Sequence, residues 1–290
     1  QTQASETTSA PSDFDTRTGI MTFSDGLQIR TTLLVDASGA NSIWRQRAGI
    51  SCMRHDYKCA ALTAEIALAA PHGQVARQIF LPDGPLALLP LPKSGRAALI
   101  WSLPARKAQA LAACDENLFN GELNAAARSV FGQLHLIGER AQQPLKAQIA
   151  ESFIGQRLAL VGEAAHVIHP LAGQGMNLTL RDIGALVDTL KNARRLGLEC
   201  GDATMLENYA GLRRADAFAG AFGTHALAEI FSGPAPARML AAVGMRGVGY
   251  IADNWPKLKD AFRRQADQGF GPLSGAARLC RCRDTSRSSA

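Results

Sequence analysis

The chain has 290 residues, of which 47% are hydrophobic and 19% charged, the proportions of an ordinary globular protein with one large or two modest domains. No apolar run reaches the roughly 18–20 residues that a membrane-spanning helix needs, and the polar residues 1–18 contain no secretory signal. The formal net charge is a moderate +6, from which we expect no nucleic-acid partner.

The six cysteines are scattered along the chain, which favours free thiols and a cytoplasmic location. Cys280 and Cys282 lack the second cysteine pair or the histidine that a metal site would need, so no metal site is predicted. The basic residues 276–290 are interpreted as a solvated, disordered tail. The alternative is attraction to an anionic membrane surface, which would make the protein peripheral to a membrane.

Residues 1–18 are expected to be disordered. A β-hairpin follows, in which 20–23 and 27–35 are the strands and the Asp-Gly pair at 25–26 forms the turn. The second strand ends in the small and polar residues 36–42, and a short helix comes next. Such a strand–helix corner is a place where open α/β sheets bind ligands.

Residues 57–104 show the alternation of an antiparallel sheet, in which apolar side chains occupy every second position between Leu62 and Leu68. The alanine-rich residues 105–132 are predicted to be helical. A strand is predicted at 144–149, where the chain would return to the first domain.

A further helix is predicted from Met176, with apolar residues at spacings of three and four along it. We expect one stripe to face the core: Leu180, Ile183, Val187 and Leu190. More helices are predicted at residues 203–221, 225–231, 239–252 and 255–268. Arg213, Arg214 and Asp216 are interpreted as a solvated face with local ion pairs.

Residues 161–182 are the most informative part of the sequence. An apolar strand at 157–161 ends at Gly162 and Glu163, and a glycine-containing loop at 170–175 leads into the helix. The free N–H groups and positive dipole end of a helix suit electron-rich oxygens, while the Glu163 carboxylate suits hydroxyl groups. A flavin offers both, a hydroxylated ribityl chain and a ring that becomes anionic on reduction. The alternative is an ordinary corner whose glycines only allow tight turns.

This stretch resembles the second flavin-binding signature of the FAD-dependent aromatic hydroxylases, the class A flavoprotein monooxygenases, and within them the ubiquinone-biosynthesis branch. The matching positions are Gly162, Ala164, Ala165, His166, His169, Pro170, Gly173, Gln174, Gly175, Asn177 and Asp182. Glu163 stands where that family usually has Asp. The run at 80–91 is also typical of the ubiquinone-type branch.

Residues 36–45 resemble the middle motif of the same family, which contacts both FAD and the nicotinamide. Gly39, Ser42 and Arg45 match it, whereas Ser38 occupies the position of its Asp, and Asp36 lies two residues too early. A plain surface turn is the alternative for this segment.

The resemblance implies an α/β (α+β) fold, with a partial FAD-binding domain of the aromatic-hydroxylase type, an antiparallel-sheet substrate domain and C-terminal helices. The FAD-binding portions would be 19–50 and 145–192, and the substrate domain would be 51–144. The C-terminal helical region would be 193–275.

The resemblance also implies which residues bind FAD: Gly39, Arg45, Gly162, Glu163, Ala164, His166, Pro170, Gly173, Gln174, Gly175, Met176 and Asn177. NAD(P)H would be the co-substrate, and reduced flavin would use O₂ to hydroxylate a lipophilic aromatic ring, a ubiquinone-biosynthesis intermediate. His166 and His169 are expected to have structural roles, and no catalytic residue is assigned.

No Gly-x-Gly-x-x-Gly fingerprint follows a strand in the first fifty residues, although this family uses one to bind the adenosine diphosphate half of FAD. We therefore expect a fragment or a truncated gene. One alternative function is a non-catalytic remnant that acts as a binding or scaffold component of a quinone-biosynthesis complex. Another is a related flavoprotein such as a halogenase or a prenyl-chain reductase.

Overall fold

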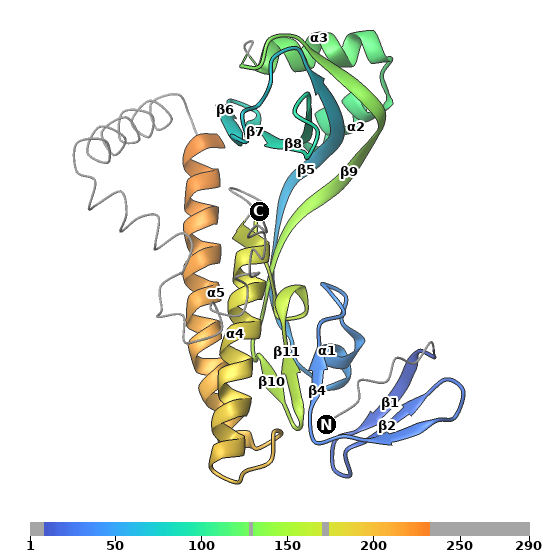
Figure 1. Cartoon of the computed structure of the whole chain (residues 1–290), viewed down its shortest axis with the longest axis vertical. Coiled ribbons are helices and arrows are strands. Elements are labelled where there is room, and N and C mark those ends of the chain that lie inside the picture. The colour runs from blue at the N-terminus through green and yellow to red at the C-terminus, as the bar shows by residue number, and fades with distance from the viewer. Residues whose placement is uncertain (1–8, 128–129, 170–173, 233–290) are drawn as a thin grey trace, which may run out of the picture.

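A computed structural model describes residues 9–127, 130–169 and 174–232, and it has the mixed α/β fold that the sequence predicts. The described strands form three sheets. Two long strands, β5 (Cys52–Leu68) and β9 (Leu134–Ala150), run side by side from the lower half of the molecule to the upper sheet (Figure 1). They connect the predicted substrate domain to the predicted flavin loops.

The upper sheet has six antiparallel strands in the order β12-β9-β5-β8-β7-β6. Its other strands are β6 (Arg77–Leu81), β7 (Gly84–Pro90), β8 (Arg96–Pro104) and β12 (His166–Val167). Two helices lie over one face, α2 (Ala105–Ala113) and α3 (Glu116–Ala127). The predicted antiparallel sheet is confirmed, and the predicted helical region is two helices.

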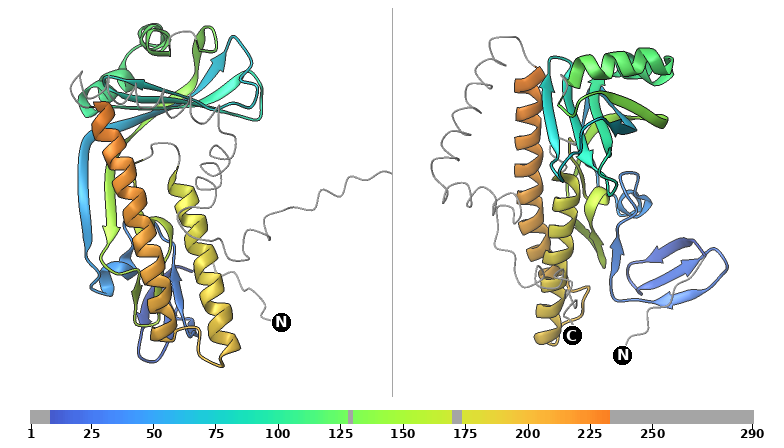
Figure 2. Two further views of the ribbon diagram at one scale, coloured as in Figure 1. Left: turned by 90° about the vertical axis from the view of Figure 1, so that its left-hand side faces the viewer. Right: turned by 45° about the horizontal axis from the view of Figure 1, so that its top comes forward.

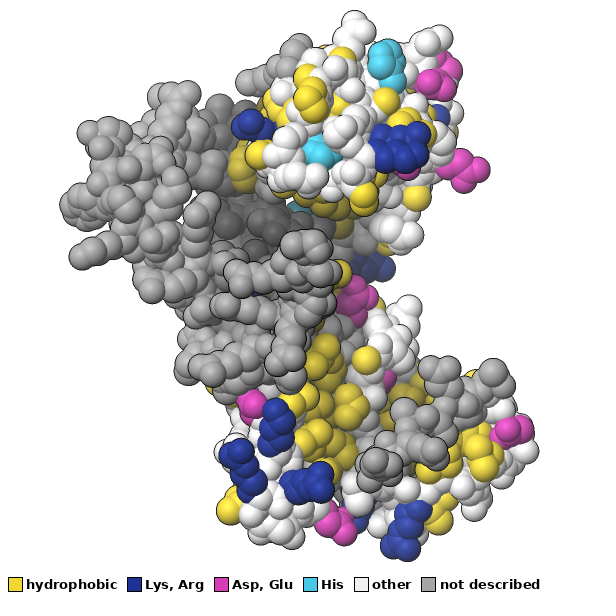
Figure 3. Space-filling view, viewed as in Figure 1, with side chains coloured by type: hydrophobic (Ala, Val, Ile, Leu, Met, Phe, Trp, Pro, Cys, Tyr) yellow, Lys and Arg dark blue, Asp and Glu magenta, His cyan; other side chains and the backbone are white. Residues whose placement is uncertain are grey.

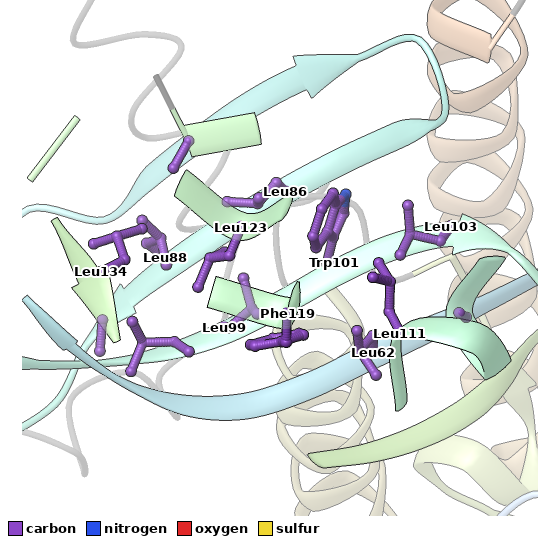
Figure 4. Packing of buried hydrophobic residues seen from close by; sticks show 14 of the residues in the cluster. Leu62, Leu86, Leu88, Leu99, Trp101, Leu103, Leu111, Phe119, Leu123 and Leu134 are labelled. Carbon is purple, nitrogen blue, oxygen red and sulfur yellow. The ribbon is translucent and has the colours of Figure 1, made fainter. Parts of the chain in front are cut away.

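The core of this half lies between the sheet and the two helices (Figure 4). Leu62 pairs with Trp101 across β5 and β8, and both are buried against Leu111 and Phe119 of the helices. Each such side chain contributes roughly 1.5–3 kcal/mol on burial. Because side chains alternate along a strand, the intervening residues of β5 and β8 belong to the opposite face of the sheet.

The lower half contains a small sheet in the order β10-β11-β4. Its strands are β10 (Ile154–Gly155), β11 (Leu158–Leu160) and β4 (Leu34–Asp36). β4 and β11 are parallel neighbours, although they lie far apart in the sequence. β4 leads to helix α1 (Ile43–Arg47), and β11 leads to the short 3₁₀ helix η1 (Gly162–Ala164).

Two long helices, α4 (Gln174–Arg195) and α5 (Ala203–Ser232), pack together beside this sheet (Figures 1 and 2). A second core joins them to β11 through buried Leu186, Leu206 and Tyr209. The predictions at 203–221 and 225–231 are parts of one helix. The helices predicted at 239–252 and 255–268, and the tail 276–290, lie outside the described residues.

The prediction that residues 1–18 are disordered is wrong for their described part. β1 (Pro11–Asp15) pairs with β2 (Ile20–Phe23), which in turn pairs with β3 (Gln28–Arg30). Phe14 packs against the lower core, which gives this polar segment an apolar anchor. The predicted hairpin with its Asp-Gly turn is confirmed, but its second strand is divided into β3 and β4.

The predicted core stripe of α4 is wrong for Leu180 and Ile183, whereas Leu190 packs against the lower core as predicted. Leu180 and Ile183 are 55% and 46% exposed, whereas Leu178 and Leu186 are buried. The buried face carries Asp182, and a pattern of apolar residues alone does not anticipate a buried carboxylate. Hydrophobic side chains gather at the surface in this half of the molecule (Figure 3).

Over the described parts of the chain, no helix has both the length and the apolar character that crossing a membrane requires. The same residues contain no group of three or more His, Cys, Asp or Glu side chains that could hold a metal ion.

Candidate functional site

The two sequence motifs lie next to each other in space. β4 and β11 pair in parallel with Leu160 opposite Asp36, and the amide of Val161 donates to the Asp36 carbonyl over 2.9 Å. Parallel neighbours end at the same edge of a sheet, so the loops that follow them meet there. This edge is where open α/β sheets bind ligands, as the sequence predicts.

Arg45 joins these two loops. Its Nη2 donates to the Ala40 carbonyl of its own loop over 2.7 Å, and its Nη1 donates to the Ala164 carbonyl of the other over 2.7 Å. The residue is only 1% exposed. Both terminal nitrogens are therefore committed to protein carbonyls, and direct contact between Arg45 and FAD stays a prediction.

Asp36 organises the turn that leads to Arg45. Its buried carboxylate accepts hydrogen bonds from the backbone and hydroxyl of Ser38 and from the hydroxyl of Ser42. The Ser42 oxygen in turn accepts from the Arg45 amide at the start of α1, as an N-cap residue does. The carboxylate two residues ahead of the motif position therefore holds the loop, a role that the sequence prediction did not assign.

Glycine is required at two points of these loops. Gly39 has φ +91°, and a Cβ at this position would have no atom within 4 Å, so the backbone there is open on one side. Gly162 has φ +62°, and a Cβ would lie 3.0 Å from the side chain of Thr179. Residues with a side chain strongly disfavour such φ values, and at Gly162 the Thr179 side chain of α4 already occupies the space that a Cβ would need.

A buried carboxylate holds the start of the second loop to α4. Asp182, which is 0% exposed, accepts from the Gly162 amide over 2.9 Å, and its Oδ2 lies 2.7 Å from Nε2 of His166. Arg213 of α5 donates from Nε to the other oxygen over 2.7 Å. His166 is thus a buried hydrogen-bonding residue, in line with the structural role expected for it.

Arg213 corrects the interpretation of its segment as a solvated face. It is 4% exposed and bonds Asp216 as well as Asp182. Burial alone would lower the pKa of Arg213, but the charge and hydrogen bond of Asp182 raise it above its ordinary value. The local ion pair with Asp216 is confirmed, and only Arg214 is exposed as expected.

The other predicted site residues lie around the start of α4. Glu163 is exposed on the loop after β11, whereas Ala164 is buried and contributes its carbonyl. α4 begins at Gln174, with Gly175 exposed, Met176 74% exposed and Asn177 half-buried. The predicted contacts of Pro170 and Gly173, and the side chain of Gln174, lie outside the described residues.

These residues fit the riboflavin half of FAD. The first turn of α4 contains no acidic residue, so its amide groups present an uncompensated positive end to a ligand. A Cβ at Gly175 or Gly39 would meet nothing within 4 Å, which leaves room for a ligand against the backbone. The exposed Glu163 carboxylate supplies the acceptor that ribityl hydroxyl groups need.

Two side chains from β5 and β9 border the site and were missed from the sequence. Gln148 is buried, and its Nε2 donates to the Ala40 carbonyl over 3.0 Å. Tyr57 packs edge-on against buried His169, with ring centroids 4.9 Å apart. Both residues lie on long strands without a motif. Gln148 lies opposite Val167 in the pairing of β9 with β12, and the pairing of β5 with β9 brings Tyr57 to the same place.

A parallel strand pair that ends in two glycine-containing loops, beside a helix start and a large antiparallel sheet, defines a flavin-binding α/β domain. A family model described as "FAD binding domain" matches residues 2–218. The chain belongs to this family.

Its relatives include ubiquinone hydroxylases. The chain is 37% identical over 246 residues to "Ubiquinone hydroxylase UbiL" of Rhodospirillum rubrum, covering 84% of this chain and 56% of that protein. It is 39% identical over 197 residues to "3-demethoxyubiquinol 3-hydroxylase" of Escherichia coli, covering 67% and 49%. The chain therefore spans about half the length of these curated relatives. The predicted resemblance to the ubiquinone branch is confirmed.

Among solved structures, the chain is similar to PqsL of P. aeruginosa in complex with 2-aminobenzoylacetate, with a TM-score of 0.64 and 26% identity. The match covers 76% of this chain and 62% of that one. A second crystal structure of the same protein, described as a probable FAD-dependent monooxygenase from Pseudomonas aeruginosa, matches with a TM-score of 0.59 and 25% identity over 76% of this chain and 61% of that one.

Proposed function

We propose that this chain forms the riboflavin-binding and substrate-binding portion of an FAD-dependent monooxygenase. The reaction is the hydroxylation of an aromatic ring with NAD(P)H and O₂, and the substrate is a ubiquinone-biosynthesis intermediate. The observation that carries the proposal is the pair of hydrogen bonds from Arg45 to the Ala40 and Ala164 carbonyls. These bonds join the loops after β4 and β11 beside the start of α4. Relatives with 37% and 39% identity whose names include ubiquinone and ubiquinol hydroxylases support the substrate class.

In this proposal the loops bind and orient the cofactor. Glu163 accepts hydrogen bonds from ribityl hydroxyl groups, and the amides at the start of α4 stabilise negative charge on the reduced ring. The contacts of Pro170 and Gly173 with the flavin stay predictions. Bound FAD supplies the redox chemistry, accepting a hydride from NAD(P)H and activating O₂. Arg45 keeps the two loops at a fixed separation by donating to the Ala40 and Ala164 carbonyls, and Gln148 holds the Ala40 carbonyl to β9.

The aromatic substrate would lie against the face of the upper sheet opposite α2 and α3. Ala61 pairs there with Ser102, and Thr63 pairs with Ile100. These uncharged side chains suit a lipophilic ring, and Ala61 and Ser102 are buried from water. Membership of a quinone-biosynthesis complex and attachment to a membrane surface are further parts of the proposal.

The test is reconstitution and turnover by the chain itself. The purified protein is incubated with FAD, separated from free cofactor and examined for visible flavin absorption. NAD(P)H oxidation is then followed with a short-chain prenylphenol under isotopically labelled O₂. We expect bound flavin and a product that carries one labelled oxygen atom. A protein that binds no flavin contradicts the proposal and favours a non-catalytic scaffold.

A further inference from the structure

We infer that Arg213 and Tyr209 of α5 are positioning residues for the loop that follows β11. The inference rests on the proposed function, in which this loop holds the ribityl chain. α5 lies outside both sequence motifs, yet its side chains reach the end of β11 and the first turns of α4. The helix would thus set the geometry of the flavin site through protein groups.

Arg213 acts through Asp182. Its Nε donates to Oδ1 of that carboxylate over 2.7 Å, while Oδ2 of the same carboxylate accepts from the Gly162 amide over 2.9 Å. One carboxylate therefore connects a guanidinium on α5 to the first residue of the loop. A buried carboxylate is costly unless its charge is balanced, so Arg213 stabilises the carboxylate that accepts from Gly162 and lies against His166.

The remaining nitrogens of Arg213 fix its own position. Nη1 donates to Asp216 over 2.6 Å, and Nη2 donates to the Leu178 carbonyl of α4 over 3.3 Å. All three nitrogens are thus used, and the side chain is buried. A planar guanidinium with donors in a fixed fork meets these three acceptors, whereas a lysine ammonium keeps the charge but not the fork.

Tyr209 provides a second attachment one helical turn earlier. Its hydroxyl donates to the carbonyl of Leu160, the last residue of β11, over 2.7 Å. Tyr209 therefore bonds the backbone directly at Leu160, and Arg213 reaches it through Asp182 at Gly162, on the other side of Val161. Glu163 is the residue after Gly162, so the direction of its side chain depends on both contacts.

A merely structural role for α5 predicts a different result. If Arg213 and Tyr209 only stabilised the fold, their loss would lower the melting temperature without a selective effect on the loop. A positioning role predicts local loosening of residues 158–169 and weaker flavin binding. Arg214 is a matched control, because it is the next residue, is exposed, and lies 5.7 Å over the Phe218 ring.

The experiment combines hydrogen exchange of the ligand-free full chain with titration by riboflavin. The variants are Arg213→Gln, Arg213→Lys, Tyr209→Phe and Arg214→Gln. A fifth variant, Leu123→Ala, removes a side chain of α3 from the core against the upper sheet and lowers stability without touching the loop. Tyr209→Phe removes one oxygen atom only, so it keeps the test valid even if Arg213→Gln does not fold.

We expect faster exchange at 158–169 in Arg213→Gln and Tyr209→Phe, and riboflavin dissociation constants raised about tenfold or more, the scale of one hydrogen bond to a charged group. Arg213→Lys should recover part of the affinity, and Arg214→Gln should match the parent. The inference is overturned if the loop exchanges and binds as in the parent, or if Leu123→Ala loosens it equally. A parent chain that binds no riboflavin refutes the proposed function, and hydrogen exchange alone then decides the inference.

Discussion

The guanidinium of Arg45 and the carbonyl of Ala164 are joined by a 2.7 Å hydrogen bond across 119 positions of sequence. This contact, together with the bond from Arg45 to Ala40, fixes the separation of the two loops that we propose hold the flavin. The relative position of the two loops therefore depends on these two hydrogen bonds of Arg45.

Replacing Arg45 by Met should remove the hydrogen bonds that join the two loops. The buried Ala164 carbonyl would lose its donor, whereas the half-buried Ala40 carbonyl would keep the hydrogen bond from Gln148. The free energy of unfolding should therefore fall by about 1–3 kcal/mol, the cost of one unsatisfied buried polar group. Urea denaturation measures the loss. Arg47→Met on the same helix is the control, since Arg47 is half-exposed and its hydrogen bond to the Ser12 carbonyl and its ion pair with Asp13 lie at the surface. Equal losses in both variants would contradict the role given to Arg45.

Gly162→Ala should destabilise the protein for two separable reasons. The positive φ alone costs about 1–3 kcal/mol for a residue with a side chain. The added Cβ would also approach Thr179 to 3.0 Å. Gly26 has φ +86° but no atom within 4 Å of an added Cβ, so Gly26→Ala should lower the thermal stability by a smaller amount. Adding Thr179→Ala to Gly162→Ala should recover only the part of the lost stability that comes from the contact with Thr179. Full recovery of the stability would show that the positive φ is not costly at this position.

Glu163→Ala should weaken flavin binding while stability changes little. The side chain is exposed, and surface substitutions usually alter stability within about 0.5 kcal/mol. Loss of a charged acceptor for a ribityl hydroxyl should raise the FAD dissociation constant about tenfold. Glu163→Asp should bind like the parent, and Glu122→Ala on α3 serves as the control. Unchanged affinity in Glu163→Ala would remove this residue from the site.

Tyr209 should resist ionisation at alkaline pH. Burial, reinforced by the charge of Asp182, raises the pKa of Tyr209 above its ordinary value of 10.0. The neutral hydroxyl is therefore favoured in the fold, and stability is lost as pH rises above 10.0, by about 1.4 kcal/mol per unit. Tyr209→Phe should remove this dependence. Phenolate absorbance that rises fully near pH 10 in the folded chain would contradict the assignment.

Much of the fold was predictable because it follows local rules. The alternation of apolar and polar residues predicted the antiparallel sheet, and the Asp-Gly pair predicted the turn of the first hairpin. The glycine-containing loops were also recognisable, since Gly39 and Gly162 have backbone conformations that other residues avoid.

The buried charges were not predictable in the same way. Arg213 is predicted to lie on a solvated face and Asp182 is predicted only as a motif position, yet both are buried, and each helps to neutralise the other from a different helix. Asp36 illustrates the same limit, since its role depends on hydroxyl groups that the turn brings to it. Such pairings depend on tertiary contacts, whereas hydrophobic periodicity reports only the average environment of a face.

The most direct test of the central claim is a competition titration of FAD with riboflavin, followed by quenching of flavin fluorescence or by calorimetry. Riboflavin contains only the half of the cofactor that the two loops are proposed to hold. We predict that riboflavin binds the chain, displaces FAD, and loses affinity in Arg45→Met and Glu163→Ala. Binding of FAD that riboflavin does not displace, or no flavin binding at all, would contradict the claim.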